Sequence, residues 1–276
     1  MRVQISLDKH RYAVILDHPI EIAIPQLFDG SQPNAFGLQD ATQQPAQAGR
    51  WRGDVLSGSP VNCRTVTTTP HANGTHTECV GHIVRDPVVA PVTLHQTLHA
   101  AVVLSVPLER LGDCGESYRG KQQPQDAVVT ARGLRDSLAA RGWLPPCSAV
   151  VVRTTPNPPA KARSRFTQDA PYLTSEAVSW LRRQGFLHLL IDLPSIDRLE
   201  DGGSVPNHRR WWDVPSGDRL EGAPSPRTIT EWIFVPDDCI DGLYLLELGV
   251  APWWSDAVPA RPRLYPLRLL TAHEEL

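Results

Sequence analysis

Three histidines and one glutamate lie within the twelve residues from His71 to His82, between two apolar segments. His76 and Glu78 are two residues apart, so on an extended strand their side chains point to the same face and can hold one ion. Imidazole nitrogen together with carboxylate oxygen suits zinc, manganese or iron, whereas calcium and magnesium prefer shells of oxygen atoms. This composition and spacing predict a divalent metal site in the segment.

The chain between His71 and His76 contains Asn73-Gly74, a strong turn signal because both residues tolerate the left-handed backbone conformation. A turn there would bring His71 back toward His76, and His82 is close enough in sequence to converge on the same ion. A second interpretation stays open at this point, in which the histidines are separate surface and cleft side chains that stabilise a loop.

The whole chain has 276 residues, of which 41% are hydrophobic and 21% charged, the composition of a soluble globular protein with a substantial core. Because no internal repeat and no clear linker is present, the sequence predicts a single domain over residues 1–276. The net charge of −3 is small, and no lysine and arginine tract is interleaved with aromatic residues. We therefore expect no nucleic-acid partner.

No window of about eighteen apolar residues occurs, and the N-terminus lacks the long apolar run of a signal peptide. We therefore expect a cytoplasmic protein with no membrane partner. The five cysteines are odd in number and widely spaced, which favours reduced thiols over a disulfide framework. Cys79 lies inside the histidine segment, where it is a nucleophile, a thiolate ligand or a small buried residue.

The elements that must position these side chains follow from hydrophobic period and end signals. Residues 148–153 and 187–193 resemble buried strands, and between them a helix begins at a cap on Thr174 or Ser175 and ends at Gly185. This order predicts a parallel pair of strands with a helical crossover. Further strands are expected over residues 3–7, 12–16, 20–24, 230–235, 243–248 and 263–269. The predicted fold class is therefore α/β with a mixed sheet.

Two segments lead into the histidine cluster. A Val- and Thr-rich strand over residues 62–69 is expected to end at His71, which places the metal site at a strand terminus. Residues 28–60 are rich in Gly, Pro, Gln and Ser without an apolar period, which predicts a long loop. Long loops within compact domains are often binding elements, so Phe36 and Trp51 are candidate lid aromatics.

A second pair of histidines, His95 and His99, has the i,i+4 spacing of a helical metal pair. The segment around the pair is short, and it lacks the neighbouring glutamate that completes a zincin motif. A role as metal ligands is therefore disfavoured for His95 and His99.

Together with His208 and Glu231, the segment from His71 to His82 resembles the cyclase family of metal-dependent hydrolases. This family includes bacterial kynurenine formamidase and isatin hydrolase. The family pattern is His-x-Gly-Thr-His-x-Asp-x-Pro-x-His. Gly74-Thr75-His76 matches it in place, and His82 falls six residues after His76, as the final histidine of the pattern does. Glu78 occupies the aspartate position.

Three downstream motifs extend the resemblance over residues 17–269. Asp192-x-Pro194-Ser195-x-Asp197 is similar to the stretch that follows the penultimate long strand of the family. His208 stands where the family has its downstream histidine ligand. Thr230-Glu231-Trp232 stands where the family has a glutamate ligand at the start of a strand.

The resemblance implies a swivelling β/β/α fold, a homo-oligomer, and one or two divalent ions, Zn or Mn. In related members the first two histidines and the aspartate bind a metal, the aspartate bridges to a second ion, and the downstream histidine and glutamate complete the second site. Carried over to this chain, the implied metal ligands are His71, His76, Glu78, His208 and Glu231.

The sequence departs from the family pattern at three positions. The first histidine of the pattern would fall on Ala72, whereas His71 is one residue earlier. Either Asn73 marks an insertion and His71 still reaches the ion, or that ligand is lost. Glu78 is one methylene longer than the aspartate, which moves a carboxylate by more than about 1 Å in a site whose distances matter to about 0.2 Å. Val80 replaces the proline.

The leading functional hypothesis is hydrolysis of an amide, a formamide or a cyclic amide or ester, as in an arylformamidase. A divalent ion would lower the pKa of bound water, and His82 would carry the proton from the water to the leaving group. Aromatic residues near the motif segments favour an aromatic small-molecule substrate. Trp211 is also near these segments, and a role in the core stays open for each tryptophan. The candidate substrate contacts are Phe36, Trp51, Trp212 and Trp232.

Two further hypotheses come from other classes. A metal-poor family member would bind a small molecule or partner without turnover, because its ligand set departs from the pattern. A thiol hydrolase built on Cys79 would be inactivated by alkylation but not by chelators. Metal content and the response to these two treatments separate the three hypotheses.

Overall fold

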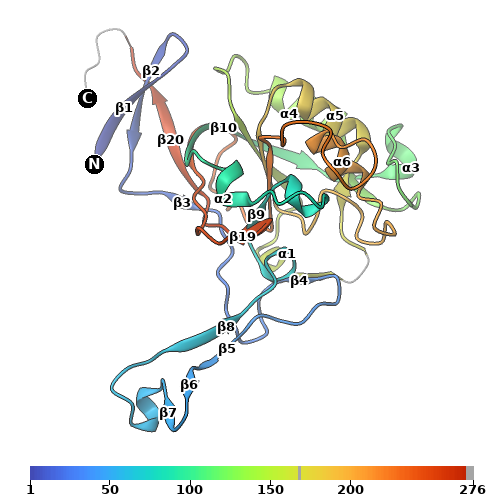
Figure 1. Ribbon diagram of the computed structural model, residues 1–276. Helices are drawn as coiled ribbons and strands as arrows, with labels where there is room; N and C mark the ends of the chain where they lie inside the picture. The colour runs from blue at the N-terminus through green and yellow to red at the C-terminus, as the bar shows by residue number, and fades with distance from the viewer. Residues whose placement is uncertain (167–168, 272–276) are drawn as a thin grey trace.

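The computed structural model describes residues 1–166 and 169–271, and Figure 1 shows a mixed α/β structure built on one large sheet. Within these residues the main sheet has eleven strands in the order β1-β2-β20-β18-β10-β13-β16-β17-β9-β19, with β3 also paired to β20. Their bounds are β1 (Arg2–Leu7), β2 (His10–Ile15), β3 (Ile20–Glu21), β9 (His76–Glu78), β10 (Leu98–Pro107), β13 (Ala149–Thr155), β16 (His188–Ile191), β17 (Thr228–Glu231), β18 (Gly242–Glu247), β19 (Ala257–Pro259) and β20 (Arg263–Leu269). The predicted fold class, α/β with a mixed sheet, is confirmed.

The remaining elements are short. The other strands are β4 (Asn34–Ala35), β5 (Thr42–Pro45), β6 (Gln47–Ala48), β7 (Trp51–Arg52), β8 (Arg64–Thr67), β11 (Glu109–Arg110), β12 (Ala127–Val129), β14 (Arg165–Phe166) and β15 (Tyr172–Leu173). The helices are α1 (Pro70–Asn73), α2 (Ala90–Thr93), α3 (Leu111–Cys114), α4 (Ala131–Ala139), α5 (Ser175–Arg183) and α6 (Pro206–Trp212), with 3-10 turns η1 (Val55–Ser57), η2 (Val80–His82) and η3 (Pro159–Arg163). Among the described residues, no helix has the length and apolar content needed to cross a bilayer.

Four strands at the centre of the sheet, β10, β13, β16 and β17, run parallel. In the sequence α4 lies between the first two of them, α5 between the next two and α6 before the last. Thr174 caps α5, because its hydroxyl accepts a hydrogen bond from the N–H of Ala177 (3.1 Å), which the first helical turn leaves without a partner. The parallel pair with a helical crossover predicted over residues 148–193 is confirmed, and the carboxyl ends of these strands meet at one edge of the sheet.

Both faces of the parallel strands are apolar, which explains their unbroken Val and Leu runs. On one face Val102, Val150 and Leu189 contribute to a large buried cluster with residues of α4, α5 and α6. The alternate residues Val151 and Leu190 belong to a second cluster on the other face. Figure 1 shows α4, α5 and α6 gathered on the same side of the sheet. The site residues that follow these strands are therefore held by a core packed on both sides.

The predicted opening hairpin is confirmed, since β1 and β2 pair antiparallel and β2 continues onto β20. The long loop predicted over residues 28–60 is wrong. This region contains β4 to β7 and η1, and β5 pairs antiparallel with β8 to form an arm that projects from the main body (Figure 1). The strands of this arm are polar and largely exposed, so they carry no hydrophobic period for a sequence pattern to detect.

Two further predictions are corrected by the strand bounds. Glu231 lies at the end of β17 and not at the start of a strand over residues 230–235, so the backbone leaves the sheet at this carboxylate. His99 lies within β10, and residues 94–97 are not helical, so His95 and His99 do not form a helical metal pair. The expected strand before the histidine segment is confirmed as β8, which leads through Thr69 into α1.

Candidate metal centre

The centre of the site is the short strand β9, which lies between β17 and β19. His76 and Glu78 occupy alternate positions on it and are fully buried, so they share a face as their spacing predicted. Glu231 lies directly opposite His76 on β17, and His76 Nε2 is 3.6 Å from Glu231 Oε2. The sheet register therefore places one imidazole between two buried carboxylates.

Three more histidines reach Glu78 from three separate elements. His71 comes from α1, with Nδ1 3.1 Å from Glu78 Oε2, and His208 comes from α6, with Nε2 3.0 Å from Glu78 Oε1. His82 comes from η2, with Nε2 3.9 Å from Glu78 Oε2. Glu231 is also 3.8 Å from His208 Nε2. All six side chains proposed from the sequence as metal ligands or proton carrier thus converge on one point.

Three of these imidazoles are fixed from outside by a hydrogen bond on the nitrogen that faces away from Glu78. His76 Nδ1 lies 3.0 Å from the carbonyl oxygen of Gly74, and His208 Nδ1 lies 2.6 Å from Asp197 Oδ2. His71 Nε2 lies 3.0 Å from Asp256 Oδ2. A carbonyl or carboxylate can only accept, so the outward nitrogen carries a proton, and the ring is oriented with its other nitrogen directed into the cluster. This arrangement is typical of histidines that bind a metal.

The inner atoms of the cluster fit a divalent ion. His76 Nε2 and Glu78 Oε2 are buried and have no hydrogen-bond partner, although buried polar atoms nearly always have one. Two groups of side chains, His71 with His76 and Glu78, and His82 with His208 and Glu78, place their ligand atoms within 4.8 Å of one another. Glu78 belongs to both groups, so its two oxygens can serve two ions. Nitrogen and oxygen donors of this kind suit zinc or manganese.

The pKa values of the two buried carboxylates, Glu78 and Glu231, shift in opposite directions. Burial raises the pKa of Glu231 well above its usual range, and the carboxylate of Glu78 raises it further. Burial also acts to raise the pKa of Glu78, but the charges of His82 and His208 outweigh it and hold that pKa well below its usual range. Two carboxylates this close need nearby positive charge, which a divalent cation supplies.

The pKa values of the imidazoles also shift in different directions. Burial acts to lower the pKa of His71, but the hydrogen bond to Asp256 and the nearby carboxylate of Glu78 outweigh it and raise the pKa to about 10. Burial and the charge of His71 lower the pKa of His76 to about 3, so His76 is a neutral imidazole with a free lone pair. His208 has a raised pKa, because Glu78 and Asp197 outweigh the effect of burial.

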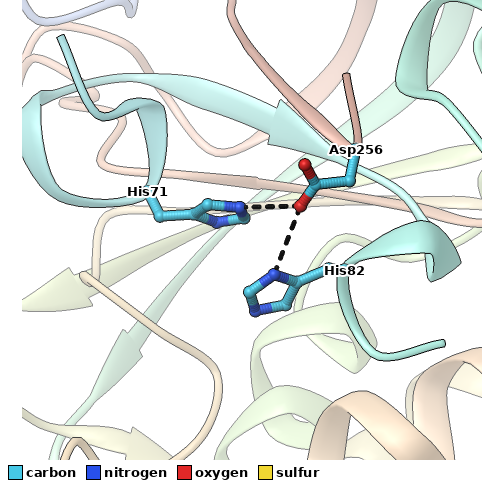
Figure 2. Close-up of side chains that lie close together, drawn as sticks. All are labelled: His71, His82 and Asp256. Carbon is cyan, nitrogen blue, oxygen red and sulfur yellow. Dashed lines mark hydrogen bonds and ion pairs between the residues drawn. The ribbon is translucent and has the colours of Figure 1, made fainter. Parts of the chain in front are cut away.

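Asp256 links two histidines at the mouth of the site. Figure 2 shows the rings of His71 and His82 near each other, both directed at the same carboxylate oxygen. Oδ2 of Asp256 lies 3.0 Å from His71 Nε2 and 3.4 Å from His82 Nδ1. These hydrogen bonds lower the pKa of Asp256. The side chain of His82 is 31% exposed and that of His71 is 22% exposed, whereas His76 and His208 are buried, so His82 is the most exposed histidine of the cluster.

A cavity of about 290 Å³ opens onto the cluster. The described residues that line it are Phe36, Leu38, Thr69, His71, Glu78, His82, Ser195, Asp197, Arg198, Leu199, Asp201, Val205, His208 and Glu231. The lining of the cavity therefore combines histidines and carboxylates with apolar side chains.

The four aromatic side chains predicted to contact substrate lie in different places. Phe36 lines the cavity. Trp212 is buried behind the histidines, with its ring centre 5.3 Å from that of His208, and Trp232 packs on Phe166 in a separate apolar cluster. Trp51 lies in β7 on the arm, beyond the pairing of β5 with β8 (Figure 1). Within this chain, Phe36 is thus the one of the four that faces the cavity, among the residues described.

Residues 14–198 match the family model described as "Putative cyclase". The chain belongs to this cyclase family. No curated protein matches the sequence.

Solved structures share the fold of this cyclase-family chain over most of its length. One is described as a potential metal-dependent hydrolase with cyclase activity (14% identity, TM-score 0.58, covering 90% of this chain and 97% of that one). Another is a predicted metal-dependent hydrolase from Bacillus stearothermophilus (14% identity, TM-score 0.56, 90% and 98%). A third is isatin hydrolase A from Labrenzia aggregata bound to benzyl benzoate (12% identity, TM-score 0.57, 90% and 93%). At identities this low the similarity establishes the fold alone.

The histidines and carboxylates of the site remain close together although the sequence departs from the cyclase-family pattern. The single turn of α1 swings His71 toward β9 although it lies one residue early, and its Nδ1 reaches Glu78. Asn73 belongs to this helix and does not adopt the left-handed conformation expected for it, whereas Gly74 has a φ of 152°. The predicted reversal is present, but a helical turn and one glycine produce it.

Sequence reasoning missed Asp256, and it gave Asp197 no role. Asp256 comes just before β19, whose three residues are too few to show a strand period. Asp197 was seen only as part of a motif, while its carboxylate in fact holds the ring of His208 and accepts from that residue's N–H (3.0 Å). A search for carboxylates within reach of each predicted histidine requires the fold, so neither residue had a distinct sequence signal.

The structure disfavours Cys79 as a nucleophile. Its side chain is fully buried, and Sγ donates to the carbonyl oxygen of Val88 (3.6 Å). Burial raises the pKa of the thiol to about 11, so the reactive thiolate is not formed near neutral pH. The thiol behaves as a small buried apolar group.

Proposed function

We propose that this chain is a metal-dependent hydrolase that cleaves a carbon–nitrogen bond in an amide, formamide or cyclic amide, or the ester bond of a related ring. One observation carries the proposal: three imidazoles, fixed from outside by Gly74, Asp197 and Asp256, direct their inner nitrogens at a buried carboxylate pair. His71, His76, Glu78, His208 and Glu231 would hold one or two divalent ions, Zn or Mn. The family and the neighbouring structures support this chemistry.

A bound divalent ion supplies Lewis acidity, which polarises the scissile carbonyl and lowers the pKa of a water molecule. The residues of the chain then handle the proton. His82 is half-buried at the cavity, and Asp256 accepts from its Nδ1–H, which leaves Nε2 to take a proton from the attacking water. As the carbon–nitrogen or carbon–oxygen bond breaks, His82 returns that proton to the leaving nitrogen or oxygen.

The shape of the cavity favours a small and partly aromatic substrate. Phe36, Leu38, Leu199 and Val205 form its apolar side, and a volume of about 290 Å³ is at the small end for ligand pockets. Among the neighbouring structures, an isatin hydrolase binds benzyl benzoate, an aromatic ester. We therefore place aryl formamides and benzo-fused lactams first among candidate substrates.

The test measures metal content and turnover in the same samples. We expect protein incubated with Zn²⁺ or Mn²⁺ to hold one or two ions per chain and to hydrolyse an aryl formamide or isatin. A chelator should abolish turnover, and re-addition of metal should restore it. His76→Ala should lose both metal and activity, because His76 Nε2 is the most buried ligand atom with no other partner.

His99→Ala is the matched control, because it removes a buried histidine outside the site. It should keep metal and activity. Absence of metal from the wild-type protein, or metal retained without turnover of any amide, formamide or ester, would overturn the hydrolase proposal. Tight binding of such a compound without product would instead favour the alternative of a binding protein.

The arm supports the proposal that the protein is a homo-oligomer. A two-stranded ribbon is only marginally stable by itself, yet the arm carries exposed apolar side chains at Val55, Leu56, Val61 and Val66. A second copy of the chain that covers these side chains would explain them. Light scattering should give at least a dimer, and Leu56→Lys should shift the mass toward the monomer; a monomeric wild-type chain would refute this proposal.

A further inference from the structure

Away from the metal centre, arginines surround a second cavity of about 340 Å³ between α5 and α6. Its described lining residues are Ser179, Arg182, Arg183, Arg210 and Arg227. Three of the five come from α5, one from α6, and Arg227 precedes β17. The lining residues that the structure describes include four guanidinium groups and no carboxylate.

The positive charge of these arginines is poorly balanced. Arg182 pairs with Asp213 (3.1 Å), whose side chain is 75% exposed, and also donates to the carbonyl oxygen of Arg210 (2.6 Å). Arg210 donates to the hydroxyl of Ser179 (2.9 Å), and Arg227 lies over the ring of Trp211. In the described part of the chain, Arg210 and Arg227 form no ion pair. Exposed pairs such as Arg182–Asp213 compensate little.

Three donors at this cavity lack a partner. The Nε atoms of Arg182, Arg210 and Arg227 are buried and make no hydrogen bond. A buried donor without an acceptor is costly, so three around one cavity need an explanation. Burial and the charges of Arg119 and Arg182 also lower the pKa of Arg210, and burial and Arg182 do the same for Arg227. The guanidinium groups repel one another in the absence of an anion.

We propose that this cavity binds the phosphate group of a small anion, either inorganic phosphate or a phosphate ester. A guanidinium group offers a planar fork of donors that matches phosphate oxygens, and several such forks can converge on one tetrahedral group. A single carboxylate has two oxygens and would leave most of these donors unused. A concave cavity of this size suits a small soluble anion.

An adjacent basic cavity gives this site room for more than one phosphate. It has a volume of about 300 Å³ and shares Arg182 and Arg210 with the first cavity. Arg119 and Arg209 also line it, together with one carboxylate, that of Asp213. A diphosphate can therefore span both cavities. Pyrophosphate is expected to bind more tightly than inorganic phosphate, because it contacts more guanidinium groups.

The test is calorimetric titration of the full chain, at low ionic strength, with inorganic phosphate, pyrophosphate and AMP. The first two probe a free phosphate and the third probes an ester, so their relative affinities identify the source. We expect Arg210→Gln and Arg227→Gln each to weaken binding by about tenfold or more, which is the effect of losing one charge-assisted hydrogen bond. Arg135→Gln, an exposed arginine on α4, is the matched control and should bind as the wild type does.

A thermal measurement guards against variants that fail to fold. Without anion, Arg210→Gln and Arg227→Gln should melt close to the wild type, since each removes a repelled charge but also loses a contact, with Ser179 or with Trp211. Pyrophosphate should raise the melting temperature of the wild type and of Arg135→Gln, but not of the two cavity variants. The proposal is overturned if none of the three probes binds, or if the cavity variants bind as tightly as Arg135→Gln.

Discussion

Two histidine clusters lie at opposite ends of the same parallel strands, and they behave in opposite ways. At the carboxyl ends, His71 and His208 contact Glu78, and their pKa values are raised. At the amino ends, the rings of His99 and His188 are tilted by 52° with their centres 4.1 Å apart. Burial, followed by the charge of His99, lowers the pKa of His188 to about 3. Residue type alone therefore does not decide what a buried histidine does.

The difference comes from the partners that each cluster has. His188 Nδ1 lies 2.9 Å from the hydroxyl of Thr228, and His99 Nε2 lies 3.0 Å from the carbonyl oxygen of Gln96. These neutral groups satisfy the rings without attracting a proton or a cation. At the other end, Glu78 and Asp197 supply negative charge inside the protein, where it is poorly screened. Carboxylates beside the histidines, and not histidine density, mark the metal centre.

The largest effect that tests this comparison is expected from Asp197→Asn. The amide keeps the size of the carboxylate but removes its charge, so the ring of His208 loses the negative charge that holds its proton on Nδ1. Loss of such an outer carboxylate typically lowers metal affinity or activity by about 10- to 100-fold. Titration of the protein with Zn²⁺ or Mn²⁺ against a competing chelator would measure the change, and turnover by the metal-loaded protein would follow it.

Thr228→Val is the control for Asp197→Asn at the opposite cluster. It removes the hydroxyl that meets His188 Nδ1 and leaves the metal centre untouched. Metal affinity should stay within about twofold of the wild type, while the free energy of unfolding falls by about 1 kcal/mol or more for the lost buried hydrogen bond. Equal losses of metal in both variants would show that the contrast between the two clusters is false.

The dependence of each histidine on its partners also explains how much of the metal centre could be predicted from the sequence. His76 and Glu78 were predictable, because their spacing on a strand is local information. The convergence of His208 and Glu231 with them came from a family resemblance, since more than a hundred residues separate these ligands from β9. Asp256 was not predictable, because nothing local distinguishes it from other carboxylates until β19 pairs with β9. Local pattern determines which face a side chain takes, and the sheet order determines what it meets.

A comparison of the arm with the long strands shows the same limit of sequence-based prediction for the fold. The strands β13 and β16 and the helix α5 were predictable from apolar runs and a Thr174 cap, because burial on both faces leaves a strong signal. The polar pairing of β5 with β8 leaves none, since both strands are exposed and backbone hydrogen bonds hold them together. Elements that bury little apolar surface escape patterns that depend on burial.

The pH dependence of unfolding in His188→Gln isolates the neutral cluster from the metal centre. The pKa of His188 is about 3 in the folded protein and near 6.5 when unfolded. Between these values the unfolded chain binds more protons, so acidification below pH 6.5 destabilises the folded wild type. This group contributes at most about 1.4 kcal/mol per pH unit. Urea unfolding at pH 7.5, 6.0 and 5.0 should therefore show a shallower loss of stability in His188→Gln, whereas parallel pH profiles would mean that His188 is not held neutral by burial.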